Sequence, residues 1–530
     1  MGLHPQQSAP TVRRITFRRG HLLQARFAPD GQTILYAGSF GNRPLETFAT
    51  RPDSPEARSV APPGASLLAI SSTGEMALQL GSRIVGGWEY SGTLARAPLG
   101  GGAPREILEG VLEADWAPDG RIQAIVHDAG GRRRLEYPIG TALYETAGYL
   151  SNIRISPRGD SVAFLDHPVR GDNTGSVALV DLSGKKRVLT AESLATDGLA
   201  WSPTGEEIWF AAGNKTELRA VTLSGQERLL WRETGPVGLR DVSKDGRVLL
   251  SRSNQGREMA GLAPGATTEQ DLTWLDWSFP AALSDDGRAL LFDEEGEGAG
   301  TGYAIYIRNT DGAPAVRLGE GGAQDLSPDG KTALGLSGQA LVLLPIGAGM
   351  PKTLPVRGLN PQGAKFFPDG QRIVLWANEP GHGSRLFKLD ATGGAPQPFT
   401  AEGISSLARG SSPVSPDGTL VAAQGGDRRI TLYPTGGGEP RPLPGTEPGD
   451  GIIRWTRDGR GLYVSRSGLP TRVEIVDAAT GRRSPWRTLA PGDPAGVFSV
   501  TPTLISGDGR SYVYSYSRLT DDLYVVEGLK

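Results

Sequence analysis

Short apolar runs alternate with polar turns along the whole chain, and the turns recur about every 43 residues. Each turn closes on a glycine. The residue just before the glycine is Asp in nine of twelve copies, the residue two before is Pro in seven, and the residue four before is apolar in all twelve. This spacing predicts one structural unit per repeat. The twelve turn glycines are Gly31, Gly74, Gly120, Gly159, Gly205, Gly246, Gly287, Gly330, Gly370, Gly418, Gly459 and Gly509.

The turn sequence Ser-Pro-Asp-Gly predicts a tight hairpin between two antiparallel strands. Proline sets the backbone angle of the second turn position, Asp bonds to nearby backbone, and Gly takes the left-handed conformation. The strand after the turn is a short continuous apolar run, as in 162–165 and 373–376, which is typical of strands covered on both faces. We therefore expect the apolar residue four before the glycine, for example Trp116, Trp201 or Trp455, to point into the core.

A second hairpin lies between successive turns, as in 177–190 and 221–231, so each repeat holds four short strands. Four strands in about 40–45 residues predict a propeller blade, which buries its faces only against neighbouring blades. The predicted fold is all-β, with tandem β-propellers of about twelve four-stranded blades. Because rings usually have four to eight blades, two six-bladed rings are the simplest division, and seven plus five stays open. The predicted domains are a linker at 1–11 and propellers at 12–268 and 269–530.

The two ends of the chain suggest how the rings close. Residues 12–17 resemble the fourth strand of a blade, and 523–527 resemble a third strand. Added to an incomplete blade, the first segment would remove an exposed sheet edge. In one arrangement 12–17 closes the first ring and 269–273 the second; in the other the two chain ends pair directly.

Composition excludes several classes of protein. The chain has no cysteine, so disulfides, cysteine-ligated zinc and a thiol nucleophile are excluded. The net charge of −3 gives no electrostatic case for nucleic-acid binding. No apolar run has the length of a membrane span, and Met1–Pro10 lacks an apolar signal-peptide core. We expect a monomer that binds no nucleic acid and has no membrane span within this sequence.

Motifs of common enzymes are absent from the sequence. No serine has glycine at both −2 and +2, and neither His-Arg-Asp nor Asp-Phe-Gly occurs, so the nucleophile elbow and the kinase core are missing. With only five histidines, a catalytic site carried by the propellers is the least favoured interpretation. We expect a protein without enzymatic activity that binds a small molecule or a protein at a propeller face.

Two histidines lie in loops that interrupt the repeat, within 166–172 and 379–383. Each loop follows the second strand of its blade, and propellers often bind ligands where such loops converge. The alternative is a pair of hydrogen-bonded loops without a ligand. The candidate ligand-binding residues are Asp166, His167, Arg170, Asp172, Glu379 and His382.

An acidic loop of the same kind follows the second strand of another repeat. Clustered carboxylates can hold a hard cation such as Ca²⁺, although the alternating spacing of a dedicated loop is missing, and a solvated acidic loop is the alternative. No other cofactor is expected. The candidate metal ligands are Asp293, Glu294, Glu295 and Glu297.

The turn repeat resembles the TolB-like, or WD40-like (PD40), propeller family. Longer strings resemble the C-terminal propeller region of bacterial membrane-anchored serine/threonine protein kinases: 69–76 (AISSTGEM), 164–172 (FLDHPVRGD), 291–298 (LFDEEGEG), 378–383 (NEPGHG) and 511–529 (SYVYSYSRLTDDLYVVEGL). The resemblance runs from about residue 11 to the end, and the longer strings are more specific than the turn.

The resemblance implies an extracytoplasmic sensor module in a signalling protein, in which a kinase domain and one membrane span precede the propeller. Neither part occurs in this sequence, and the family supplies no ligand residues to carry over. The alternative is a TolB-like scaffold for protein–protein contacts in the cell envelope.

Overall fold

The computed structural model describes residues 10–41, 43–86, 89–130, 132–168, 174–193, 196–213, 215–295, 302–466 and 468–529. Within these ranges every regular element is a β-strand, and no helix could cross a membrane. The chain forms two compact units, Met1–Asn254 with Leu519–Lys530, and Gln255–Arg518. The sequence predicts contiguous domains that meet at 268/269, and this boundary stays a prediction. In the structure the chain passes from one unit to the other at 254/255 and again at 518/519.

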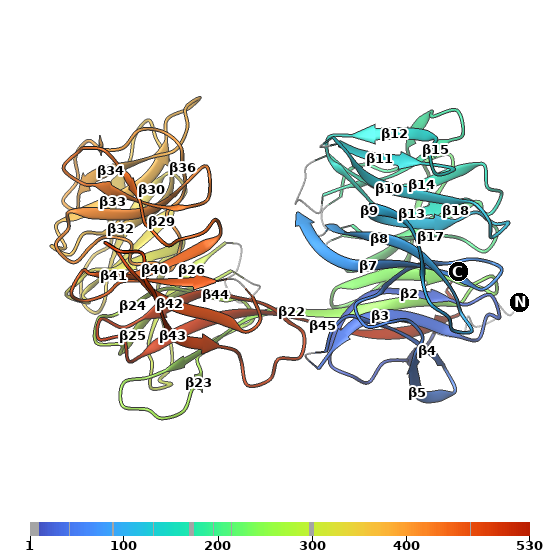
Figure 1. Cartoon of the computed structure of the whole chain (residues 1–530), viewed down its shortest axis with the longest axis horizontal. Coiled ribbons are helices and arrows are strands. Elements are labelled where there is room, and N and C mark those ends of the chain that lie inside the picture. The colour runs from blue at the N-terminus through green and yellow to red at the C-terminus, as the bar shows by residue number, and fades with distance from the viewer. Residues whose placement is uncertain are drawn as a thin grey trace, which may run out of the picture. The chain divides into compact units, whose positions relative to one another are not determined.

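The first unit consists of antiparallel sheets whose strands follow chain order (Figure 1). Strand β9 runs through two four-stranded groups, which joins them into one seven-stranded sheet. The strands are β2 (Gly20–Phe27), β3 (Ile34–Phe40), β4 (Glu46–Arg51), β5 (Ser54–Ser59); β6 (Ser66–Ile70), β7 (Glu75–Gly86), β8 (Glu89–Pro98), β9 (Arg105–Trp116), β10 (Gln123–Ala129), β11 (Arg132–Glu136), β12 (Ala142–Thr146); β13 (Tyr149–Ile155), β14 (Ser161–His167), β15 (Ser176–Asp181), β16 (Lys186–Val188); β17 (Asp197–Trp201), β18 (Glu207–Ala212), β19 (Glu217–Thr222), β20 (Glu227–Arg232); and β21 (Val237–Val242) with β1 (Thr11–Arg14).

The second unit repeats the same design, with five four-stranded sheets and part of a shared one. Its strands are β24 (Ser278–Leu283), β25 (Ala289–Glu294), β26 (Ala304–Asn309), β27 (Val316–Glu320); β28 (Gly322–Leu326), β29 (Thr332–Ser337), β30 (Ala340–Pro345), β31 (Lys352–Pro355); β32 (Asn360–Phe366), β33 (Arg372–Asn378), β34 (Arg385–Asp390), β35 (Gln397–Pro398); β36 (Ile404–Ser406), β37 (Leu420–Gly425), β38 (Ile430–Pro434), β39 (Arg441–Pro442); β40 (Asp450–Trp455), β41 (Gly461–Arg466), β42 (Thr471–Asp477), β43 (Arg483–Leu489); and β44 (Val497–Ile505) with β23 (Gln270–Asp271).

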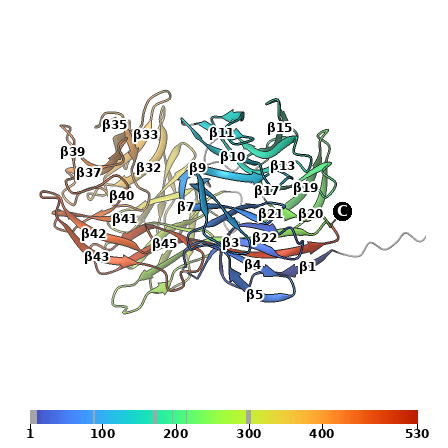
Figure 2. The same ribbon diagram turned by 45° about the vertical axis from the view of Figure 1, so that its right-hand side comes forward.

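Two long strands, β22 (Val248–Leu262) and β45 (Tyr512–Glu527), are divided between the units. About half of each strand belongs to the first unit and the rest to the second. In the first unit they lie between β21 and β1, with Thr11 opposite Glu527 (Figure 2). In the second unit they lie between β44 and β23. The chain ends therefore pair directly, and each unit gains a four-stranded group that removes a free sheet edge.

The inner strands of each unit form a closed ring, which makes each unit a propeller. In the first unit β2, β6, β9, β13, β17 and β21 contact one another in that order, and β21 returns to β2. In the second unit β40, β44, β24, β28 and β32 are joined by contacts, and hydrophobic clusters link β33 to β37 and β38 to β41. The number of blades per ring stays a prediction.

The core lies between neighbouring sheets, as the apolar runs predict. On β14, Val162 and Phe164 pack against the preceding sheet, whereas Ala163 and Leu165 pack against the following one. Trp116, Trp201 and Trp455 are buried, which confirms that the position before the turn faces the core. All twelve turn glycines have φ between +66° and +85°, so the predicted left-handed closure is present in every repeat.

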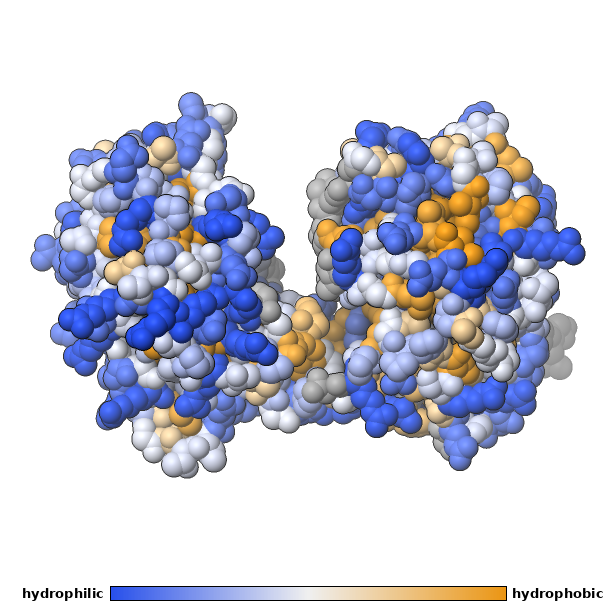
Figure 3. Space-filling model, in the orientation of Figure 1, coloured by the Kyte–Doolittle hydropathy of each residue, from blue (hydrophilic) through white to orange (hydrophobic). Residues whose placement is uncertain are grey.

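Surface hydropathy differs between the faces drawn in Figure 3. Hydrophobic residues gather in the part of the first unit where Figure 1 labels β9, β13 and β17, whereas the drawn face of the second unit is mostly hydrophilic.

Candidate ligand-binding site

The residue five before each turn glycine lies on the inner strand, and we call it the inner-ring position. The first unit has Arg26, Ala69, Asp115, Arg154, Ala200 and Asp241 at this position; the second unit has Ala282, Asp325, Lys365, Pro413, Arg454 and Leu504. Charged residues thus occupy seven inner-ring positions, on strands whose neighbouring residues are mainly apolar. Because the inner strands surround the channel of each propeller, these charges define what the channel can hold.

A carboxylate at the inner-ring position joins one sheet to the next. The carboxylate of Asp115 accepts a hydrogen bond from the backbone N–H of Ile155 at 2.8 Å. Asp241 does the same with Phe27 at 2.9 Å, and Asp325 with Phe366 at 2.8 Å. In each case the acceptor belongs to one repeat and the donor to the next around the ring. The residue at the next inner-ring position is basic in all three cases, namely Arg154, Arg26 and Lys365.

In the first unit these side chains are packed among themselves. Arg26 is 5% exposed and donates to the carbonyls of Ala25 and Arg240, both at 2.8 Å. Arg154 is 6% exposed and donates to the same Arg240 carbonyl at 3.1 Å. Burial, followed by the nearby Arg154 charge, lowers the pKa of Arg26 to about 9. The turn end of this channel is therefore occupied by the protein's own guanidinium groups.

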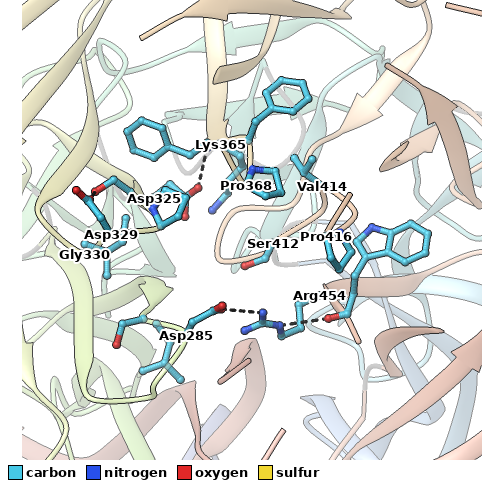
Figure 4. Close-up of a pocket in the computed structure, with 18 of the residues that line it drawn as sticks. Asp285, Asp325, Asp329, Gly330, Lys365, Pro368, Ser412, Val414, Pro416 and Arg454 are labelled. Atoms are coloured by element: carbon cyan, nitrogen blue, oxygen red, sulfur yellow. Dashed lines mark hydrogen bonds and ion pairs between the residues drawn. The ribbon is translucent and has the colours of Figure 1, made fainter. Parts of the chain in front are cut away.

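In the second unit the same level of the channel holds an open pocket of about 510 Å³. Residues from five successive repeats line it, from the turn after β24 to the turn after β40 (Figure 4). The aromatic and proline residues Phe366, Pro368, Pro413 and Trp455 form much of its wall. This volume lies within the range of sites for small ligands or for a short segment of another protein.

The basic groups Lys365 and Arg454 lie on opposite sides of the open space in Figure 4. Lys365 is 2% exposed, and its ammonium donates to the carbonyls of Gln324 at 2.6 Å and Ala281 at 3.4 Å. Burial lowers the pKa of Lys365, although the neighbouring Asp325 carboxylate raises it. Burial also raises the pKa of Asp325, although Lys365 lowers it. Each group thus offsets part of the cost of burying the other.

Arg454 reaches across the pocket to an acidic residue of its rim. Its guanidinium donates to the Ile505 carbonyl at 2.7 Å and to Asp285 at 2.9 Å (Figure 4). Asp285 stands two before Gly287, where seven of the twelve turns have Pro. Its side chain is 81% exposed. The rim also carries the turn residues Asp286 and Asp329 and the basic Arg457, so the rim is mainly acidic around a basic interior.

The edge of the pocket nearest the fourth sheet of this unit is formed by an interrupted inner strand. Strand β36 ends at Ser406, and the chain returns to the sheet at Val414, which forms a bridge with Val421. Between them Ser412 donates its N–H to the Ile453 carbonyl at 2.7 Å and lies at the pocket (Figure 4). Gly410 has φ of +75°, and a Cβ there would lie 2.8 Å from Pro502.

Arg409 ties this interrupted strand to the opposite side of the ring. Its guanidinium pairs with Asp293 and with Glu295, the latter at 2.6 Å, and stacks on the Phe279 ring at 4.1 Å. Asp293 is fully buried. Burial raises the pKa of Asp293 to about 7, although Arg409 lowers it. The segment beside the pocket is therefore held by a buried ion pair whose acid titrates close to neutrality.

The four predicted ligand residues that the structure describes do not line this pocket. Asp166 pairs with Lys186, and His167 is 2% exposed, stacks on Tyr149 at 4.0 Å and bonds to Ser151 at 2.9 Å. In the second unit, Glu379 pairs with Arg385, and the exposed His382 pairs with Glu402 at 3.0 Å. These contacts fit hydrogen-bonded loops. The other two candidates, Arg170 and Asp172, lie outside the described residues, and the ligand set stays a prediction.

Three of the four predicted calcium ligands have partners within the protein. Asp293 and Glu295 both bind Arg409, whereas Glu294 accepts hydrogen bonds from the Ser278 hydroxyl and from the backbone N–H groups of Leu275 and Trp277. Among the described residues no three acidic or histidine side chains are grouped so that they could hold a metal ion. Glu297 lies outside the described residues, so the four-residue set stays a prediction.

Sequence reasoning missed the inner-ring position, although a signal was present. The apolar residue four before the glycine indicates the core, whereas the functional signal lies in the residue just before it. A charged residue there interrupts an otherwise apolar strand, as in Ile-Arg-Ile-Ser at 153–156 or Ala-Lys-Phe-Phe at 364–367. Read around each ring, these charges could have pointed to the channel.

The comparisons with known proteins give likeness of architecture only. No protein-family model and no curated protein sequence matches the chain. Among solved structures, the chain is similar to the tricorn protease, with a TM-score of 0.38, 13% identity, and 94% of this chain and 57% of that chain covered. It is similar to the GH74 enzyme of Niastella koreensis, with a TM-score of 0.34, 11% identity, and coverage of 96% and 90%. It is also similar to a putative TolB from Agrobacterium tumefaciens, with a TM-score of 0.25, 17% identity, and coverage of 63% and 94%. This chain thus spans little more than half of the tricorn protease chain.

Proposed function

We propose that the chain is a non-catalytic binding protein and that its ligand occupies the pocket of the second unit. The observation that carries the proposal is the contrast at the inner-ring position. The first unit fills this level of its channel with buried Arg26 and Arg154, whereas the second leaves about 510 Å³ open between Lys365 and Arg454. A preformed cavity with a few converging polar groups is the usual form of a binding site on a rigid scaffold.

The bonding of the lining side chains favours binding over catalysis. The hydroxyls of Ser284 and Ser327 donate to the turn carboxylates of Asp286 and Asp329, both at 2.6 Å, so they serve the turns. Lys365 is bound to two backbone carbonyls, and its neighbouring carboxylate Asp325 is bound to a backbone N–H. These polar groups are thus fixed by bonds to the turns and the backbone, which suits a preformed binding site better than proton transfer in catalysis.

The biological setting is a further proposal. The strings that resemble kinase-associated propellers favour the sensor module of a bacterial serine/threonine kinase-type protein, placed outside the cytoplasm. A TolB-like envelope scaffold is the second candidate. The hydrophobic residues that Figure 3 shows on the first unit are the feature that favours a scaffold, because protein partners often cover such patches. In either setting the pocket would receive a small molecule or a segment of a partner protein.

A pocket-blocking variant tests the proposal. Ser412 is exposed at the pocket and makes no side-chain hydrogen bond among the described residues, so Ser412→Trp should fill the cavity and preserve the fold. Peptides selected from a random displayed library on the immobilised wild-type chain should bind Ser412→Trp at least tenfold more weakly. Ser59→Trp, at an exposed serine of β5 in the first unit, is the matched control and should bind them normally. Selected peptides that bind Ser412→Trp as well as the wild type would refute the assignment, as would a selection without enrichment.

A further inference from the structure

The ion pair between Arg454 and Asp285 has the properties of an exchangeable contact. The Arg454 side chain is 14% exposed and held at one end by the Ile505 carbonyl, whereas Asp285 is 81% exposed. An ion pair with one partner in solvent contributes little to stability, because water competes for the exposed carboxylate. Another carboxylate could therefore replace Asp285 on Arg454 at small cost.

Lys365 offers a second contact to an anion. An ammonium has three N–H donors, and Lys365 directs two of them to the carbonyls of Gln324 and Ala281. For the third, the described residues provide no acceptor. Because Lys365 lines the pocket, a ligand oxygen there would complete its hydrogen bonding.

The charges inside the pocket indicate the charge of the ligand. Among the charged lining residues that are buried or half-buried, Lys365 and Arg454 are basic and Asp325 is acidic. The remaining charged lining residues are exposed and belong to the rim: Asp285, Asp286, Asp329 and Arg457. This leaves one positive charge in excess at the interior. In the free protein Asp285 supplies the balancing negative charge from the rim.

We propose that the group inserted into this pocket is a carboxylate, which displaces Asp285 from Arg454 and accepts a hydrogen bond from Lys365. The inference rests on the proposed function, since it assigns the chemistry of a ligand to the same site. A carboxylate carries the single negative charge that the interior lacks. A phosphate dianion would bring a second negative charge close to Asp325.

Propionate and its neutral isostere propionamide are suitable probes, because each fits easily in the cavity and they differ mainly in charge. Saturation-transfer NMR on the full chain, in a buffer free of carboxylates and phosphate, should show propionate binding with a Kd in the millimolar range. Propionamide should bind at least tenfold more weakly. Inorganic phosphate has no carbon-bound proton to observe, so it is added as a competitor and should displace propionate only at concentrations above the Kd of propionate. Displacement at lower concentrations would overturn the assignment to a carboxylate.

Three variants locate the binding. Asp285→Asn removes the competing internal carboxylate and should tighten propionate binding several-fold. Asp276→Asn makes the same change of charge at an exposed residue outside the pocket lining and should leave binding unchanged. Arg454→Gln should weaken binding at least tenfold, and Ser412→Trp, which keeps every charge, should do the same even if Arg454→Gln folds poorly. Unchanged propionate affinity in Asp285→Asn and Ser412→Trp would contradict the inference.

The result also separates this inference from the proposed function. Suppose that propionate fails to bind but a selected peptide without any carboxylate binds the wild type and is lost in Ser412→Trp. The carboxylate assignment is then wrong, and the binding function of the pocket stands. If no probe or peptide responds to Ser412→Trp, both are wrong.

Discussion

The two propellers place different residues at the same position of the same repeat. In chain order, the inner-ring residues of the first unit are Arg, Ala, Asp, Arg, Ala and Asp. Those of the second unit are Ala, Asp, Lys, Pro, Arg and Leu. Both sets keep the bond from an inner-ring Asp to the next sheet. The first unit uses two long guanidinium groups to fill its channel, whereas the second has one ammonium and an arginine drawn aside to Asp285. The inner-ring residues, together with the interrupted inner strand after Ser406, therefore distinguish the filled channel from the one with a pocket.

The largest expected effect comes from removing a guanidinium of the first unit. Arg26→Ala leaves the Asp241 carboxylate without the guanidinium of the next inner-ring position and removes one of the two buried positive charges near Asp115, the other being Arg154. Breaking a buried charge network in this way costs about 3–5 kcal/mol. Urea unfolding of the full chain should show the loss in the transition of the first unit. The double variant Arg26→Ala/Asp241→Asn should recover part of it, and a loss below about 1 kcal/mol would contradict a packed charge network.

A smaller effect is expected where the second unit interrupts its inner strand. Gly410→Ala places a Cβ at φ of +75° and 2.8 Å from Pro502. The backbone strain alone costs about 1–3 kcal/mol, and displacement of this segment should also weaken propionate binding at the adjacent pocket. Gly381→Ala is the control, because Gly381 also has positive φ but a Cβ there meets nothing within 4 Å. Equal losses of stability in both variants would show that contact with Pro502 is unimportant.

Removal of Arg409 should give a loss of stability that depends on pH. The native pKa of Asp293 is about 7 and lies above the ordinary value of 3.8, so the native state retains a proton that the unfolded chain releases. The contribution of Asp293 to the free energy of unfolding therefore falls as the pH rises from about 4 to about 7. Arg409→Gln raises the pKa of Asp293 further and extends the fall to higher pH.

The expected loss for Arg409→Gln is larger at pH 8.5 than at pH 6 by about 1–2 kcal/mol, because each unit of pKa corresponds to about 1.4 kcal/mol. Urea unfolding at both pH values measures it. Arg409→Gln/Asp293→Asn should remove the pH dependence, and Arg372→Gln, at an exposed ion pair with Asp369, should show none. The same loss at both pH values for Arg409→Gln would show that Asp293 is not the titrating group.

The smallest effect is expected at the rim. Asp285→Pro restores the proline of seven other turns, and no backbone bond from the Asp285 N–H is recorded in the described residues. Proline should raise the free energy of unfolding by about 0.4–1 kcal/mol, because it restricts the unfolded chain. Loss of the exposed ion pair should lower the same free energy by about 0–1 kcal/mol. Thermal unfolding should thus shift little, while propionate affinity rises as in Asp285→Asn. A marked destabilisation would mean that Asp285 has a structural role.

Sequence alone predicted the architecture, because the determinants of each hairpin are local. Turn chemistry fixed the left-handed glycines, and apolar runs such as 162–165 identified strands that are buried on both faces. The division of β22 and β45 between two units was not predictable, since pairing of residue 11 with residue 527 is not encoded in a local pattern. The sequence left that closure as one of two alternatives.

The candidate site was harder to predict, because it depends on contacts between repeats. His167 attracted attention as a rare residue, yet stacking on Tyr149 and a bond to Ser151 account for its burial. Lys365 and Arg454 are ordinary in sequence and become notable only when five repeats are placed around one channel. A rare residue type therefore indicates the candidate site less well than a charged residue within an apolar strand.

A crystal structure of the full chain soaked with propionate is the most direct test of the account. We expect one carboxylate in the second unit, in contact with Arg454 and Lys365, with Asp285 moved away from the guanidinium. We expect no propionate at the turn end of the first unit's channel, where Arg26 and Arg154 should keep their bonds to the Arg240 carbonyl. Propionate bound in the first unit's channel, or an empty second-unit pocket at a saturating concentration, would contradict the account.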